Sequence, residues 1–186
     1  MARSRFLSVL AASVLISACG SIVRHDLIRL VPGQQRVPPD SHVLVLKIPD
    51  GSGRSDGPAH GSGAALAAAM RDSLLAHGFP PQVSGSDDLE RGFVEASVAN
   101  IAFVLKVVPT EWEDNATKWS GKPDSAALSI ELYSVPSKTL VGTGTYSLSS
   151  TKNADENPSP NRFIPEFADN GLAPLFGWSS RPRGIY

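Results

Sequence analysis

The pattern of hydrophobic and polar positions changes period several times along the chain, and each change predicts a secondary-structure element. Short, continuous runs of branched apolar residues, HVLVLKI and IAFVLKVV, are typical of buried strands. The segment DSAALSIELYSV instead alternates apolar and polar residues, as a half-exposed antiparallel strand does. The turn PSKT and a further strand follow it, and together they predict a hairpin. The predicted strands cover residues 42–48, 82–84, 101–108, 124–135 and 140–150.

Apolar residues at helical spacing predict three helices, over 63–77, over 88–98 and from about Phe163 onward. Pro174 should kink or end the third helix, because proline lacks the N–H group and clashes with the preceding turn. The element order is β-α-β-α-β-β-β-α. It predicts one α/β (α+β) domain with a mixed, mainly antiparallel sheet of four or five strands packed against two or three helices.

The N-terminus has the layout of a secretory signal, with two arginines, an apolar run and then small residues. The apolar run over 6–18 is shorter than the roughly 20 residues of a membrane-spanning helix, so we expect residues 1–18 to be cleaved. The letters ISAC, which end at Cys19, resemble the lipobox of bacterial lipoproteins. This implies a diacylglycerol and palmitate anchor on Cys19; the alternative is an ordinary signal peptide with an incidental cysteine.

Cys19 is the only cysteine of the chain, so its acylation would leave no thiol for a disulfide, a metal or a nucleophile. Gly20 follows it, which by the same resemblance favours the outer membrane, with the protein facing the periplasm; the inner membrane stays possible. We expect residues 19–41 to be the lipidated cysteine and a tether with a short strand near Leu27 to Val31, 42–178 the globular domain, and 179–186 a disordered tail.

Length and charge narrow the classes of function. Cleavage would leave 168 of the 186 residues, enough for one domain with a hydrophobic core. Removal of Arg3 and Arg5 leaves 15 basic residues of 17 against 18 acidic ones, a net charge of −3. This balance gives no reason to expect nucleic acid as a partner.

The histidines and the glycine loop are the candidates for a metal site and a phosphate site. The four histidines, at positions 25, 42, 60 and 77, do not fall at ligand spacing with one another or with carboxylates, so we expect no metal and no cofactor. The glycine loop before the first helix lacks the lysine of a P-loop and the glycine spacing of a dinucleotide loop. Backbone N–H groups around Gly61, Ser62 and Gly63 could still hold an anion at the helix start.

The most unusual stretch is TEWEDNATKWSGKPD, from Thr110 to Asp124. If the preceding strand continues, Glu111 and Glu113 lie on one face, and paired carboxylates serve glycosidases as acid and base. Two neighbours on one strand give no opposed geometry across a sugar, however. The residue types therefore favour a connection between two strands fastened by Trp112 and Trp119, with a protein-binding role as the alternative.

This stretch resembles the W-E-D-x-A-T-x-W-S-G-K-P-D hallmark of a family of short proteobacterial lipoproteins that share a domain of unknown function. The resemblance extends from Val43 to about Phe176 and includes PDG at 49–51. It implies a lipid-anchored α/β domain and carries no catalytic residues. The positions that match the hallmark are Trp112, Glu113, Asp114, Thr117, Trp119, Ser120, Gly121, Lys122, Pro123 and Asp124.

Three hypotheses remain. The leading one is a non-enzymatic accessory lipoprotein that binds an unidentified envelope protein. The second is an envelope glycan hydrolase that uses Glu111, Glu113 or Asp114. The third is an anion or ligand sensor at the Gly61–Gly63 loop.

Overall fold

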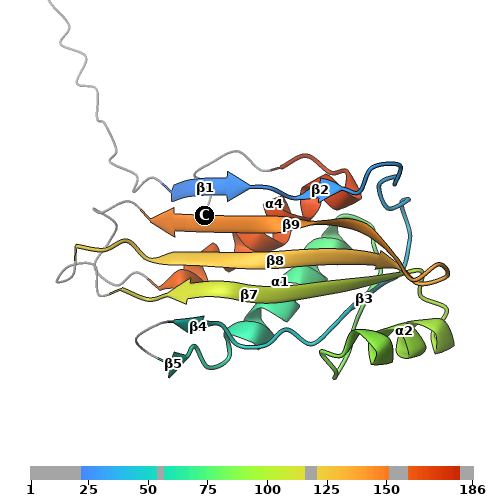
Figure 1. The fold of residues 1–186 in the computed structure, drawn as a ribbon, viewed down its shortest axis with the longest axis horizontal. Helices are drawn as coiled ribbons and strands as arrows, with labels where there is room; N and C mark the ends of the chain where they lie inside the picture. The colour runs from blue at the N-terminus through green and yellow to red at the C-terminus, as the bar shows by residue number, and fades with distance from the viewer. Residues whose placement is uncertain (1–21, 54–56, 116–120, 151–158, 181–186) are drawn as a thin grey trace, which may run out of the picture.

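The computed structural model describes residues 22–53, 57–115, 121–150 and 159–180. This part of the chain holds a seven-stranded sheet, a two-stranded sheet and three α-helices (Figure 1). The strands are β1 (Ile22–Asp26), β2 (Arg29–Leu30), β3 (Val43–Val45), β4 (Ser52–Gly53), β5 (Gly57–Pro58), β6 (Pro81–Val83), β7 (Phe103–Glu113), β8 (Ser125–Ser134) and β9 (Thr139–Ser150). The helices are α1 (Ser62–Ala76), α2 (Leu89–Val98), the 3₁₀ helix η1 (Pro160–Phe163) and α4 (Ile164–Phe176).

The large sheet confirms the predicted fold class. Its strand order is β1-β9-β8-β7-β3-β6, with β2 also paired to β9. Strand β3 is parallel to β6 and β7, whereas the β7–β8, β8–β9, β1–β9 and β2–β9 pairs are antiparallel. All five predicted strands are present as β3, β6, β7, β8 and β9, within a single domain.

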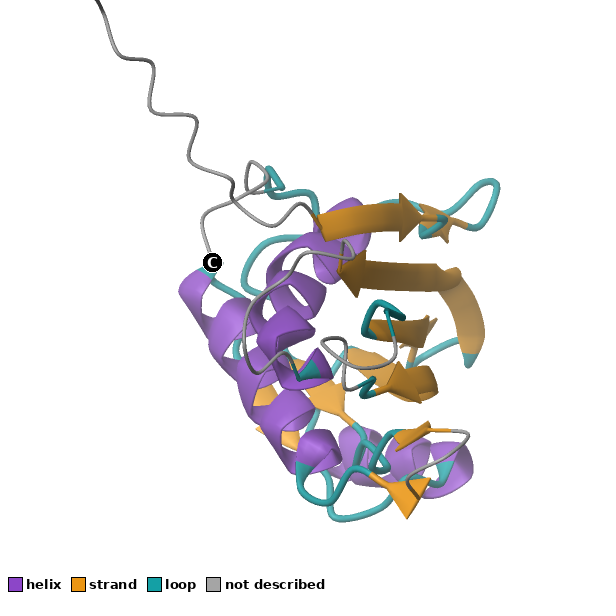
Figure 2. Cartoon of the chain, turned by 90° about the vertical axis from the view of Figure 1, so that its left-hand side faces the viewer, coloured by secondary structure: helices purple, strands orange, loops and turns teal. Residues whose placement is uncertain are grey.

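Helices cover the two faces of this sheet unequally. Helices α1 and α4 lie side by side on one face, where the main core forms (Figures 1 and 2). Helix α2 packs on the other face over β3 and the start of β7, with Phe93 against Leu44, Leu46 and Val104. Because β3 alternates Val43 and Val45 toward the first core with Leu44 and Leu46 toward the second, it is buried on both faces. Beyond α2, the outer face of β7, β8 and β9 carries polar side chains.

The predicted tether over 19–41 differs from the structure. Residues of β1 and β2 extend the sheet along β9, so the predicted hairpin of β8 and β9 is internal to the sheet. Ile28 and Val37 are buried, at 7% and 3% exposure, and hold this segment on the core. The segment is short and interrupted by polar residues and PG, so its sequence predicts only the short strand near Leu27 to Val31, where β2 lies, and gives no signal for β1.

Helix α4 contains Pro174 and ends two residues later, at Phe176. Gly177 follows in the left-handed conformation, with φ of 92°, and its N–H group donates to the Ala173 carbonyl. Pro174 therefore lies in the last turn of α4, and the helix ends within two residues of the position at which the sequence predicted a kink or an end.

Candidate functional site

The strand that opens the tryptophan motif changes its facing at a β-bulge. Leu105 and Val107 of β7 belong to the core under α1 and α4. The register with β8 then shifts between Pro109 and Glu111. A bulge inserts one extra residue into one strand, and this one turns Trp112 toward the same core at 2% exposure. Trp112 therefore points into the core and is not available to bind a partner.

The loop after β3 covers this indole. A Cβ atom added to Gly51 would lie 2.6 Å from Cγ of Trp112, and one added to Gly53 would lie 2.7 Å from the Trp112 carbonyl oxygen. Real Cβ contacts are not this short, so both positions need glycine. The PDGSG letters and the tryptophan motif, distant in sequence, therefore form one packed unit.

The start of α1 holds a carboxylate from the chain itself. The N–H groups of Gly63 and Gly61 donate to the two carboxylate oxygens of Asp50, at 2.9 and 3.1 Å. These two bonds hold the pKa of Asp50 below its ordinary value of 3.8. The Ser62 N–H group donates to the Ala59 carbonyl, and the Ser62 hydroxyl accepts from Gly51 N–H. An anion bound at 61–63 would have to displace Asp50 from these donors.

The end of the motif closes the connection between β7 and β8. Asp124 is fully buried, and its Oδ1 accepts the Asn115 N–H at 2.8 Å. Asp124 and Ser150 exchange two further bonds, from Asp124 N–H to the serine hydroxyl and from Ser150 N–H to the aspartate carbonyl. Burial raises the pKa of Asp124, while the Asn115 bond and the Arg162 guanidinium, 3.6 Å from Oδ2, oppose the rise. Asp124 thus joins β8, β9 and η1.

Other positions of the motif are placed in part. Gly121 has φ of 64° and Lys122 is exposed, and the Pro123 carbonyl accepts a bond from the Asn115 side chain at 2.7 Å. Thr117, Trp119, Ser120 and the lipobox residue Cys19 lie outside the described residues.

Glu111 and Glu113, two of the three carboxylates of the glycosidase hypothesis, lie on the outer face of the sheet. Glu111 accepts a hydrogen bond from the Ser125 hydroxyl, and Glu113 and Asp114 also have partners. Glu111 and Glu113 lie on the same side of β7, as predicted, because the register is regular beyond the bulge. They come from one strand and line no part of the hollow described below.

A serine, a histidine and an aspartate also meet between α1 and α4. The Ser73 hydroxyl donates to Asp169 at 2.7 Å, while Nε2 of His77 lies 4.0 Å from the same carboxylate oxygen. His77 stacks on Trp178, with ring centroids 4.2 Å apart. The serine donates to the aspartate and not to the histidine, which is the wrong order for an activated nucleophile. We therefore assign this group to helix packing.

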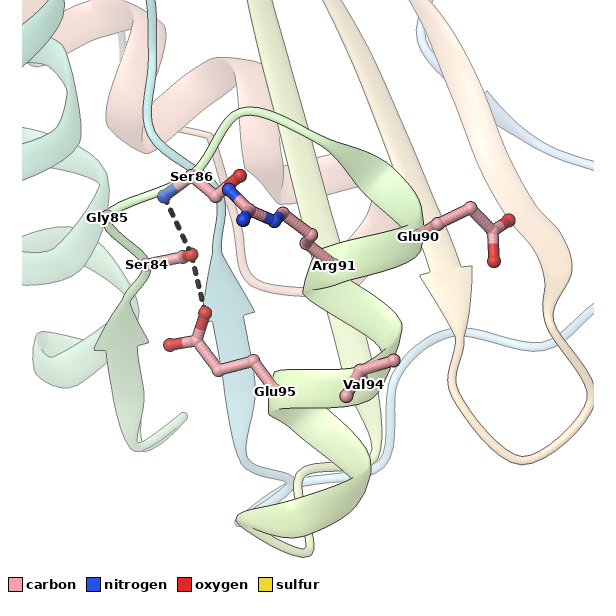
Figure 3. A pocket seen from close by; sticks show the side chains of 7 residues that line it. All are labelled: Ser84, Gly85, Ser86, Glu90, Arg91, Val94 and Glu95. Atoms are coloured by element: carbon pink, nitrogen blue, oxygen red, sulfur yellow. Dashed lines mark hydrogen bonds between the residues drawn. The ribbon is translucent and has the colours of Figure 1, made fainter.

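The surface of α2 was not singled out from the sequence. Val94 and Val98, one helical turn apart, are 65% and 85% exposed. Val94 borders an open hollow lined by Ser84, Gly85, Ser86, Glu90, Arg91, Val94 and Glu95 (Figure 3). The Ser84 hydroxyl donates to Glu95 at 2.6 Å and accepts from Ser86 N–H, which holds the wall of the hollow in place. In the sequence, the feature that indicates this surface is the pair Val94 and Val98, which lie one turn apart and away from the face that Phe93 buries.

Tyr133 lies between this helix and the open sheet face. Its ring meets Phe93 edge-on and its hydroxyl donates to Glu131 at 3.0 Å, while Lys106 pairs with Glu131 at 3.1 Å. Burial, with the neighbouring carboxylate, raises the pKa of Tyr133 from 10.0 to about 12.

Alkaline titration should show this shift. Since the folded state holds the phenol proton more tightly, the stability from Tyr133 is present below pH 10 and is lost as the pH rises toward about 12. The measurement is phenolate absorbance of the wild type minus that of Tyr133→Phe. A difference curve with its midpoint at 10 would contradict the described environment.

The described residues contain neither a metal-binding cluster nor a membrane-spanning helix. Among the described residues, no group of three or more His, Cys, Asp or Glu side chains could hold a metal ion. Within the same residues, the helices are too short or too polar to cross a bilayer.

Comparison with known proteins gives a likeness of fold. No family model and no curated protein matches the chain. The PelC dodecamer from Paraburkholderia phytofirmans is similar, with a TM-score of 0.56 and 14% identity over 87% of this chain and 99% of that chain. The lipoprotein GNA1162 from Neisseria meningitidis follows with a TM-score of 0.47 and 11% identity, over 62% of this chain and 88% of that one.

A third similar structure is the protein XCC0632 from Xanthomonas campestris, of the DUF330 family. Its TM-score is 0.48 and its identity 13%, over 82% of this chain and 94% of that chain. The likeness of fold therefore rests on PelC. The resemblance to the family of short proteobacterial lipoproteins, drawn from the stretch Thr110 to Asp124, stays a prediction.

Proposed function

We propose that this protein is a lipid-anchored, non-enzymatic module of the bacterial cell envelope that binds another envelope protein through the surface of α2. The lipobox-like letters before Cys19 support the anchor, and Gly20 supports the periplasmic side of the outer membrane. The observation that carries the binding function is the exposed pair Val94 and Val98 beside the hollow. Apolar side chains gathered next to polar ones are typical of protein-binding sites.

The charge of this surface indicates which partner fits it. Residues 86–98 contain four carboxylates and one basic side chain, Arg91. Asp88 caps α2 by accepting the Arg91 N–H, Glu95 is bonded to Ser84, and Glu90, 76% exposed in its side chain, pairs with Lys138 at 3.2 Å. A protein segment with apolar side chains flanked by lysine or arginine would complement it.

A non-enzymatic role is supported by the way the chemically capable groups are used. Asp50 caps α1 and Asp124 joins three elements. The Ser73 hydroxyl donates to Asp169, so His77 does not activate it. We therefore expect no glycan cleavage by the protein, and Glu111→Gln and Glu113→Gln variants that behave as the wild type in cells.

Self-association is the first form of binding to measure, because PelC, which shares the fold, is a dodecamer. The mass of the purified lipidated protein, by light scattering in detergent, separates a complex of identical chains from one with another protein.

Replacement of Val94 and Val98 by aspartate should weaken partner binding at least tenfold, about 1.4 kcal/mol. The substitution removes apolar contact and adds negative charge at the centre of the surface. The measurement is the yield of cross-linked adduct from a photoreactive residue at Ser97, an exposed neighbour on α2, in intact cells.

Leu75→Asp is the matched control. Leu75 is 62% exposed but lies on α1, on the other side of the sheet. Its replacement should leave the adduct unchanged. An equal loss in both variants would show that α2 is not the binding surface, and an adduct unaffected by either would exclude the valines.

A further inference from the structure

A second exposed surface lies on the opposite edge of the sheet, in the first strand after Cys19. Strands β1 and β2 follow β9 in one register, from Ile22 opposite Ser150 to Leu30 opposite Gly142. Side chains alternate along a strand, which places four exposed residues in one row on the outer face. This β1 row consists of Val23, His25, Leu27 and Arg29.

The fold does not use the β1 row. Residues of the opposite parity face α4, where Ile28 is buried and Nη1 of Arg24 lies 3.8 Å from the buried carboxylate of Glu166. Asp26 accepts the Ile28 N–H at 3.0 Å. Val23 and Leu27 remain 44% and 64% exposed. The row thus leaves two large apolar side chains in water, alternating with His25 and Arg29.

The β9 side chains beside the β1 row on the outer face are uncharged. The outward residues of β9 opposite it are hydroxyl-bearing: Thr143, Thr145, Ser147 and Ser149. The next carboxylate across this face is Glu131, opposite Thr143 on β8. At about 5 Å per strand it is about 10 Å from β1. Asp26 of β1 is also exposed but belongs to the opposite face, so on the outer face no described carboxylate is nearer to the row than Glu131.

The chain limits how far this edge can be from the lipid. Two residues, Gly20 and Ser21, separate Cys19 from Ile22, so the Cα atoms of Cys19 and Ile22 are three steps and at most about 11 Å apart. From the anchoring in the proposed function, on which this inference depends, we propose that the β1 row rests on the phospholipid bilayer. Val23 and Leu27 enter the headgroup region, and Arg29 pairs with lipid phosphates.

The composition of the row favours lipid over other occupants. Apolar side chains that alternate with a basic group suit the boundary between acyl chains and phosphates, as in peripheral membrane segments. The contact would also cover β1, an edge strand that pairs with β9 on one side only among the described strands. The domain would then lie by this edge on the membrane, with α2 on the same face of the sheet near the opposite edge.

The full lipidated chain in nanodiscs allows a direct test. Acylation blocks the only natural thiol, so Leu27→Cys and Val98→Cys each offer one site for a fluorescent label. Both positions are exposed, and they lie at opposite edges. Phospholipids with nitroxide headgroups should quench the label at 27 and spare the label at 98. Adding Arg29→Glu should reduce quenching at 27, whereas Arg91→Glu on α2 should leave it unchanged.

Each other outcome overturns the proposal. Equal quenching at both positions, or none at 27, shows that this edge does not rest on lipid. If the label at 27 is still shielded from an aqueous quencher in a lipid-free control, a second protein chain covers the edge. Mass spectrometry of Cys19 separates the two claims: without lipid the anchoring fails, and with lipid but no quenching at 27 only this inference fails.

Discussion

Trp112→Ala should lower the free energy of unfolding by about 3 to 5 kcal/mol, the usual cost of truncating a buried tryptophan. The indole is 2% exposed and belongs to the core under α1 and α4. Its removal would leave a cavity between the end of β7 and the loop around Gly51, and backbone contacts at Gly53 limit collapse into it. Urea denaturation followed by circular dichroism measures the loss.

Trp178→Ala is the control for a tryptophan of the same size. Trp178 is only partly buried, stacks on His77 and donates its indole N–H to the Asp169 carbonyl. Its truncation should cost clearly less than that of Trp112. Equal costs would mean that burial does not distinguish the two indoles.

Gly51→Ala tests the same packing from the other side. The added methyl would lie 2.6 Å from Cγ of Trp112, so the substitution should be destabilising in the wild type. In the Trp112→Ala background the indole is gone and the methyl has room. The two substitutions should therefore be non-additive by about 1 to 3 kcal/mol. Additive costs would contradict a direct contact between these residues.

The local pattern of the chain was sufficient to predict the strands β3, β6, β7, β8 and β9 and the three helices. Apart from the three-residue strand β6, each has a clear period or a long apolar run, and each keeps its type in the structure. Strand β1 was missed, and only the strand near Leu27 to Val31 that corresponds to β2 was predicted. The hydrogen bonds of both strands come from β9, far along the chain, and their own residues alternate over too short a length. Long-range pairing of this kind leaves little local signal.

The facing of Trp112 was also beyond local reasoning. Counting in steps of two from Leu105 places Glu111 in the core and Trp112 outside. The register shift after Pro109 reverses both. A bulge depends on how β7 and β8 pair, so the strand's own letters do not reveal it.

The glycine loop shows a different limit. The letters around Gly61 and Gly63 were sufficient to predict N–H groups available to an anion at a helix start, but in the structure those of Gly61 and Gly63 donate to Asp50. Their acceptor, Asp50, lies in PDG, on the other side of a loop whose course the sequence does not fix. The same three letters therefore serve both sites: Asp50 caps α1, and Gly51 admits Trp112.

Gly63→Ala should be the most damaging glycine substitution at this junction, with a loss of about 3 kcal/mol or more, the upper part of the range for overpacking. Alanine in a helix is ordinarily more stable than glycine by about 0.5 to 1 kcal/mol. Here the sign is reversed, because the new Cβ would lie 2.3 Å from the Ile48 carbonyl oxygen and 2.7 Å from the Pro49 carbonyl group. These are backbone atoms, which cannot rotate away as a side chain would.

To relieve this clash, the start of α1 would have to move away from the backbone of Ile48 and Pro49, which follow β3. That movement would lengthen the 2.9 Å bond from Gly63 N–H to Asp50 and loosen the loop over Trp112. Gly85→Ala is the matched control, since no heavy atom lies within 4 Å of its added Cβ and its φ is not left-handed. It should change stability by less than about 0.5 kcal/mol. A Gly63→Ala protein as stable as the wild type in urea would show that α1 does not start against this backbone.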